Sequence, residues 1–167
     1  AMPLDMKWDA NSEEINYQVY DSLIKSVEPQ KPELYVWPET AAPCYLQLEK
    51  SCQDRVGEIV RRTGAPHLVG ALSASTINGE RRYHNACFHV RADGTVDQRY
   101  DKVKLVPFAE TVPYQDYLPF LRPEKILSVL SFIKTFDVQW WSDFRPGIAG
   151  RLFKSDSLTY LPEICFE

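Results

Sequence analysis

Residues 34–72 of the chain read LYVWPETAAPCYLQLEKSCQDRVGEIVRRTGAPHLVGAL. Two short apolar runs, 34–37 and 67–72, enclose a segment at 46–63 in which apolar residues recur on one side. This periodicity predicts a helix, and Gly64 provides its stop because glycine accepts the left-handed backbone that ends many helices. The two runs are typical of buried strands, and strands that alternate with helices indicate an α/β protein built in layers.

The segments on either side of this stretch extend the pattern. Residues 12–27 carry an apolar residue at every fourth position after a capping-box sequence, so we expect a helix there. Runs at 86–91 and 95–100 flank Asp93-Gly94, a dipeptide that strongly favours a hairpin turn. The predicted order is therefore helix, strand, helix, strand and hairpin.

The composition is that of one globular domain. The 167 residues are enough for one hydrophobic core and few for two, and 44% of them are apolar. The formal net charge is -4 and no basic run occurs, which argues against a nucleic-acid partner. No apolar run approaches the ~20 residues that a helix needs to span a bilayer.

Cysteine spacing predicts neither a zinc site nor a disulfide. Four cysteines occur, and no pair has zinc-site spacing. If Cys44 and Cys52 flank or share one helix, their separation corresponds to roughly 12 Å of helical rise. A disulfide requires the two Cα atoms to lie within ~7 Å of each other. We therefore expect no disulfide framework, and the redox compartment stays open.

Three segments carry residue types that serve in catalysis. Glu39 follows the first predicted strand, at the end of a strand where α/β sheets place their sites. Lys102 follows the predicted hairpin, and Cys165 follows an apolar residue near the end of the chain. Taken one at a time, each has an ordinary explanation: a loop carboxylate, a solvated lysine and an inert core thiol.

Taken together, the three segments resemble a known set of motifs. They read Trp-Pro-Glu-Thr at 37–40, Tyr-x-Lys-x-x-Leu-Val-Pro-Phe-x-Glu at 100–110 and Ile-Cys-Phe-Glu at 164–167. Their order and internal spacing resemble the Glu, Lys and Cys motifs of the nitrilase superfamily, and within it those of the apolipoprotein N-acyltransferases. The resemblance covers nearly the whole chain, because further segments also fit the family: 6–9, 84–85 and 144–147.

The resemblance assigns roles residue by residue. Glu39 matches the general base, Lys102 the catalytic lysine and Cys165 the nucleophile. Glu110, eight residues after Lys102, matches a second glutamate that helps to position the nucleophile and the lysine. The residues that complete the third motif are expected to support the nucleophile: Phe166 and Glu167.

These residue types suit acyl transfer. A thiolate attacks an ester or amide carbonyl, a carboxylate takes the thiol proton, and a fixed ammonium stabilises the oxyanion of the tetrahedral intermediate. Collapse of the intermediate gives a thioester, which an amine or water then resolves. This chemistry needs no metal and no organic cofactor.

The resemblance implies an α-β-β-α sandwich of the nitrilase type, of which residues 1–167 form a part. The first strand and everything after the nucleophile are expected to be missing. It also implies an acyltransferase that moves an acyl chain from a phospholipid to the N-terminal amine of a diacylglyceryl-modified lipoprotein. Helices upstream of Ala1 would anchor this enzyme in the inner (plasma) membrane, with the domain on the periplasmic, extracytoplasmic side.

Residues 114–141 are crowded with aromatic and aliphatic side chains and have no clean polar face; we call them the apolar arm. They either pack into the core or form an arm over the active site that contacts lipid. We expect the arm, because the pair Trp140-Trp141 suits a membrane interface. A soluble nitrilase-type amidase that uses water is an alternative function, and an inactive truncated module that only binds is a second.

Overall fold

The computed structural model describes residues 10–107, 109–111, 117, 144–155, 158–165 and 167. Most of the apolar arm, with Trp140 and Trp141, lies outside the described residues, as does Phe166. The predictions made for these residues therefore stay predictions.

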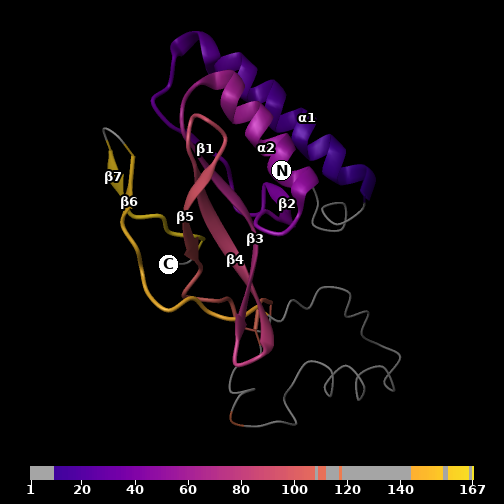
Figure 1. The fold of residues 1–167 in the computed structure, drawn as a ribbon, viewed down its shortest axis with the longest axis vertical. Helices are drawn as coiled ribbons and strands as arrows, with labels where there is room; N and C mark the ends of the chain where they lie inside the picture. The colour runs from indigo at the N-terminus through magenta and orange to yellow at the C-terminus, as the bar shows by residue number, and fades with distance from the viewer. Residues whose placement is uncertain (1–9, 108, 112–116, 118–143, 156–157, 166) are drawn as a thin grey trace.

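The described residues form an α/β fold in which one mixed sheet carries two helices (Figure 1). The strands of this sheet are β1 (Tyr35–Val36), β2 (Ala42–Tyr45), β3 (His67–Ile77), β4 (Glu80–Val90) and β5 (Val96–Asp101). The helices are α1 (Ala10–Val27) and α2 (Lys50–Thr63), with the 3-10 turn η2 (Glu28–Gln30) after α1. A separate small sheet pairs β6 (Phe153–Lys154) with β7 (Thr159–Tyr160).

β3 is the strand on which the sheet is organised. β1 and β2 pair in succession with one edge of β3, both in parallel, so that Tyr35 lies opposite His67 and Ala42 lies opposite Ala71. β4 pairs antiparallel with the other edge of β3, and β5 pairs antiparallel with β4. The chain between β1 and β2 thus interrupts a line of pairing along β3, and Glu39 lies in this interruption.

Two hydrophobic clusters form on opposite faces of the sheet. On one face α1 and α2 lie side by side (Figure 1), and their apolar residues pack with those of the strands. This helix-side cluster includes Tyr17, Val56, Val60, Val69 and Phe88. The second cluster contains Leu68, Tyr100, Phe153 and Ile164. It lies on the other face, because Leu68 and Val69 are neighbours on one strand and their side chains point in opposite directions.

Turn residues join the elements where their backbone angles allow it. Gly64 ends α2 with a φ of 67°, and Gly94 turns the chain between β4 and β5 with a φ of 85°, so both predicted turns are confirmed. Asn78 and Gly79 join β3 to β4 with φ values of 54° and 80°. Asn-Gly is the preferred sequence for such a two-residue hairpin turn, so the sequence also contains a signal for a hairpin at this position. β3 and β4 are therefore longer than predicted.

Both predicted helices are confirmed, although their details differ. α2 begins at Lys50 instead of residue 46, because residues 42–45 pair with β3 as β2. α1 buries Tyr17 and Ile24 against the sheet. The apolar residues spaced four apart that predicted α1 lie on its exposed side: Ile15, Val19 and Leu23.

A disulfide joins Cys44 to Cys52, so the prediction of no disulfide is wrong. Cys44 lies on β2 and Cys52 near the start of α2, and the chain turns at Tyr45 between them. The two Cα atoms are therefore 6.5 Å apart instead of being separated by the rise of a helix. The bridge is buried beneath α1, where the hydroxyl of Tyr17 lies 3.2 Å from Sγ of Cys52.

Candidate active site

Glu39 lies where the chain leaves the sheet between β1 and β2. Pro38 begins this interruption, because proline has no N–H to donate to a neighbouring strand. The N–H of Ala41 donates to the carbonyl oxygen of Pro38 at 3.2 Å, and Thr40 has a φ of 52°. The backbone therefore makes a tight turn that presents Glu39; we call residues 38–41 the glutamate turn.

Gly70 on β3 makes room for the glutamate turn. A Cβ atom at position 70 would lie 2.2 Å from the carbonyl oxygen of Pro38 and 3.0 Å from Cα of Glu39. Real Cβ atoms do not approach other atoms so closely. The missing side chain at Gly70 thus allows Glu39 to lie directly against the central strand.

Trp37 anchors the same turn through a buried histidine. The indole N–H of Trp37 donates to Nδ1 of His67 at 2.9 Å, and Nε2 of His67 lies 2.9 Å from the hydroxyl of Thr63. Because Nδ1 accepts, the neutral ring carries its proton on Nε2. Burial, and then the nearby Arg62, lower the pKa of His67 to about 4, so the ring is uncharged at neutral pH.

Lys102 places a buried ammonium against Glu39. Its side chain is 1% exposed, and Nζ lies 3.1 Å from Oε1 of Glu39 and 2.9 Å from Oε2 of Glu110. Burial alone would lower the pKa of Lys102, but hydrogen bonds and attraction from Glu110 and Glu39 outweigh it and raise that pKa. The ordinary explanation, a solvated lysine, is therefore wrong.

Glu110 is the third charged member of this network, and it also holds the loop that follows Lys102 through two hydrogen bonds. Its Oε2 accepts a hydrogen bond from the N–H of Val106 at 2.8 Å, and its own N–H donates to the carbonyl oxygen of Val106 at 2.9 Å. The carbonyl oxygen of Glu110 accepts from the N–H of Phe144 at 2.9 Å. The described segments that precede and follow the apolar arm in sequence therefore meet at Glu110.

Asn85 on β4 is a further member of the network. Its Nδ2 donates to Oε1 of Glu39 at 2.6 Å and to Oε1 of Glu110 at 3.2 Å. Sequence analysis placed residues 84–85 among the supporting segments and assigned them no role. The family resemblance was the signal that pointed to Asn85, because the predicted strand began at residue 86.

Cys165 has a free, exposed thiol on a tight turn. Its φ of 59° is a left-handed conformation that costs a residue with a side chain on the order of 1 kcal/mol. The preceding residue, Ile164, packs with Leu68 and Tyr100. Tyr100 and Lys102 are two residues apart at the end of β5, so this cluster lies on the sheet face to which Lys102 belongs.

Glu167 attaches the Cys165 turn to the residues beside Lys102. Its carboxylate accepts hydrogen bonds from the hydroxyl of Tyr100 at 2.7 Å and from the N–H groups of Val103 at 2.7 Å, Lys104 at 2.9 Å and Ile164 at 2.9 Å. Burial would raise the pKa of Glu167, but these bonds outweigh burial and lower that pKa. The carboxylate is thus ionised when it holds the turn.

The structure brings Glu39, Lys102 and Glu110 into direct contact, and Glu167 bonds the Cys165 turn to residues 103–104. Close approach of Sγ of Cys165 to Glu39 and Lys102 stays a prediction. The other free thiol, Cys87, is partly buried, and this burial raises its pKa to about 12. Cys87 is therefore unsuited to act as a nucleophile.

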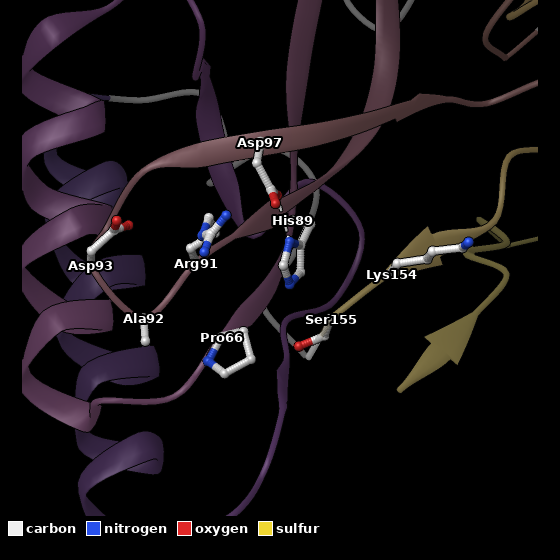
Figure 2. Close-up of a pocket in the computed structure, with 8 residues that line it drawn as sticks. All are labelled: Pro66, His89, Arg91, Ala92, Asp93, Asp97, Lys154 and Ser155. Carbon is white, nitrogen blue, oxygen red and sulfur yellow. Dashed lines mark hydrogen bonds and ion pairs between the residues drawn. The ribbon is translucent and has the colours of Figure 1, made fainter. Parts of the chain in front are cut away.

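A cavity lies apart from this network. Its volume is about 250 Å³, and His89 and Asp97 are among the residues that line it (Figure 2). Nδ1 of His89 lies 2.5 Å from Oδ1 of Asp97. Neither Glu39 nor Lys102 is among its described lining residues.

Within the described ranges, no group of three or more His, Cys, Asp or Glu side chains could hold a metal ion. None of the helices in that part of the chain combines the length and the apolar character that crossing a membrane requires.

Known structures share the fold of this chain. No family model matches the chain. The solved structure of an amidase from Nesterenkonia sp. AN1 superposes with a TM-score of 0.55 and 14% identity, covering 92% of this chain and 52% of that one. A second structure of the Nesterenkonia AN1 amidase, described as a nitrilase-superfamily enzyme, has a TM-score of 0.52, 15% identity and coverage of 89% and 49%. These similarities concern the fold.

Curated proteins are also similar to this chain in sequence. An apolipoprotein N-acyltransferase of Geobacter metallireducens is 37% identical over 119 residues, which cover 70% of this chain and 23% of the relative. One from Pseudomonas aeruginosa (strain LESB58) is 32% identical over 165 residues, which cover 98% and 29%. Over most of its length the chain is similar to proteins named apolipoprotein N-acyltransferases. The expected nitrilase-type α/β fold, present in part, is confirmed, and the chain spans less than a third of the length of these relatives.

Proposed function

We propose that the protein is an acyltransferase that moves an acyl chain from a phospholipid to the N-terminal amine of a diacylglyceryl-modified lipoprotein. The observation that carries the proposal is the buried contact of Lys102 with Glu39 and Glu110 in a chain whose relatives are named apolipoprotein N-acyltransferases. Lys102 is buried, so its contacts with the two carboxylates are not an ordinary surface ion pair. Buried ionisable groups with shifted pKa values are typical of catalytic sites.

In the first half of the reaction, Sγ of Cys165 attacks the ester carbonyl of the phospholipid while Glu39 takes the thiol proton. Negative charge develops on the carbonyl oxygen, and the ammonium of Lys102 and the backbone N–H that follows Cys165 stabilise it. The C–O bond of the ester then breaks. The departing alkoxide takes the proton from Glu39 and leaves as a lysophospholipid, and the acyl group stays on Cys165 as a thioester.

In the second half, the lipoprotein amine attacks the thioester carbonyl and gives its proton to Glu39. The C–S bond breaks, the amide forms, and the thiolate of Cys165 recovers the proton from Glu39. Glu110 holds Lys102 in place during both halves, because it contacts Nζ through both oxygens, at 3.0 and 2.9 Å. Water in place of the amine would turn the same steps into hydrolysis.

The site of action in this proposal is the extracytoplasmic side of the inner membrane. The Cys44–Cys52 disulfide supports this location, because disulfides persist in oxidising compartments such as the periplasm and are rare in the cytosol. The apolar arm is proposed to contact lipid beside the active site. Its support is the hydrogen bond between Phe144 and Glu110, which joins the chain after the arm to the network.

The proposal is tested by trapping the acyl-enzyme. We expect the full-length protein, incubated with phospholipid and no acceptor, to gain one acyl adduct on Cys165 by mass spectrometry. Cys165→Ala should abolish the adduct, and Cys87→Ala should leave it unchanged. An adduct on another cysteine, or acyl transfer that survives Cys165→Ala, would contradict the proposal. Addition of the lipoprotein acceptor then distinguishes an N-acyltransferase from an amidase, since only the first forms an N-acylated product.

A further inference from the structure

Asn85 has a position in the network that its sequence motif did not explain. The residue is 3% exposed and lies on β4, opposite Leu72 of β3. Its side-chain nitrogen lies 2.6 Å from Oε1 of Glu39 and 3.2 Å from Oε1 of Glu110. The two hydrogens of this amide can therefore serve two carboxylates that come from different segments of the chain.

The orientation of the amide follows from charge. Carboxylates in contact with an ammonium are ionised and can only accept hydrogen bonds, so the amide nitrogen and not the amide oxygen has to face them. The opposite orientation would place a third oxygen against two negative charges. Among the described residues, Oδ1 of Asn85 is buried and has no hydrogen-bond partner, so the carboxylates, and not that oxygen, determine how the side chain is held.

The backbone of Asn85 adds a third contact. Its carbonyl oxygen accepts a hydrogen bond from the N–H of Lys102 at 2.9 Å. One residue thus holds the main chain of the lysine and the side chains of both glutamates.

The charges explain why a neutral donor is needed at this point. Glu39 and Glu110 share the single ammonium of Lys102, so the three side chains carry a net charge of about -1 when all are ionised. The two carboxylates repel each other. An amide N–H attracts both of them without adding a charge that would compete with the substrate oxyanion.

We propose that Asn85 is a positioning residue that holds Glu39 in place as the general base of this site. The inference rests on the proposed role of Glu39. Asn85 acts through Glu39 and Glu110 and does not itself contact the reacting atoms.

The test measures how fast iodoacetamide alkylates Cys165 as a function of pH in the full-length protein, with the adduct located by mass spectrometry. This rate reports thiolate formation without any acyl transfer. Asn85→Asp places a negative charge against the two carboxylates, so we expect the acidic limb of the rate profile to move to higher pH by about one unit. Asn85→Leu keeps the branched shape of the side chain and removes the donors, so we expect a smaller shift in the same direction.

His89→Gln is the matched control. His89 is 2% exposed on the same strand and bonds Asp97 instead of the network (Figure 2). Its replacement should lower the melting temperature and leave the pH profile unchanged. If both Asn85 variants melt below the assay temperature, Asn85→Ser, which retains one donor, takes their place with a smaller expected shift.

The outcomes separate this inference from the proposed function. Wild-type profiles in folded Asn85→Asp and Asn85→Leu, or an equal shift in His89→Gln, would overturn the positioning role. Failure of the wild-type protein to form an acyl-enzyme, with the pH shifts intact, would count against acyl transfer from phospholipid and leave the role of Asn85 supported. A shift in the Asn85 variants alone supports the inference.

Discussion

Replacing Gly70 by alanine should displace Glu39, although Gly70 lies on β3 and Glu39 on the glutamate turn between β1 and β2. The new Cβ atom would lie 2.2 Å from the carbonyl oxygen of Pro38, whereas ordinary contact begins at 3.4 Å. Either β3 or the glutamate turn therefore has to move by about 1.2 Å. The obstacle is backbone, so no side-chain rotation can relieve it.

Expressed as free energies, the consequences for activity and for stability are of similar size, because a 100-fold loss in rate corresponds to about 2.7 kcal/mol. Overpacking of this kind costs about 1–3 kcal/mol of unfolding free energy. A displacement of about 1 Å in a catalytic group costs on the order of 100-fold in rate. We expect Gly70→Ala to fold with a reduced melting temperature and to lose about 100-fold in the rate at which Cys165 becomes acylated.

The measurement compares initial rates of acyl-enzyme formation in the full-length protein, with melting temperature recorded for each variant. Gly150→Ala is the control, since a Cβ there would lie 3.6 Å from Cδ1 of Leu161, which is an ordinary contact. It should retain the wild-type rate. A folded Gly70→Ala variant with the wild-type rate would refute the reasoning, because Glu39 would then tolerate displacement of its turn or play no part.

Three further predictions concern the disulfide, a buried histidine and the arm. Reduction of Cys44–Cys52, or its replacement by two alanines, should lower the free energy of unfolding by about 2–3 kcal/mol in denaturant titrations, and no change would contradict a native bridge. The pKa of His67 is lowered from 6.5 to about 4 in the folded protein. The contribution of this neutral ring to the free energy of unfolding is therefore fully present above about pH 6.5, and about 3 kcal/mol of it is lost as the pH falls toward 4. His67→Gln should flatten that dependence, and an unaltered pH profile would show that another group titrates. Trp140→Ser with Trp141→Ser should reduce acylation by membrane lipid and spare acylation by a short soluble ester; equal loss of both with a lower melting temperature would assign the tryptophans to the core.

Local patterns predicted the elements of this fold well. The periodicity of α1 and α2 and the turn signals at Gly64 and Asp93-Gly94 depend on neighbours within a few residues, and these parts are confirmed. The same patterns did not say which side of α1 is buried. The surface of a helix that faces a sheet is decided by what the sheet presents, and here Tyr17 packs inward while Leu23 stays exposed.

The motifs likewise named the charged residues of the site in order along the chain, and the structure brings Glu39, Lys102 and Glu110 together. Their partners depend on contacts across the sheet. Gly70 matters because the glutamate turn crosses it, and Asn85 because β4 lies between β3 and the end of β5.

By itself, then, the sequence determined the α/β class, the helices, the hairpin at Asp93-Gly94 and the residue types available for acyl transfer, because these follow from local backbone preferences and from motif spacing. Only the tertiary structure decided that Cys44 meets Cys52 and that one amide serves two carboxylates. The physical reason is that a disulfide or a hydrogen bond depends on distance in space. That distance is set by how β2 turns into α2 and by the pairing of β3 with β4, and no sequence interval encodes it.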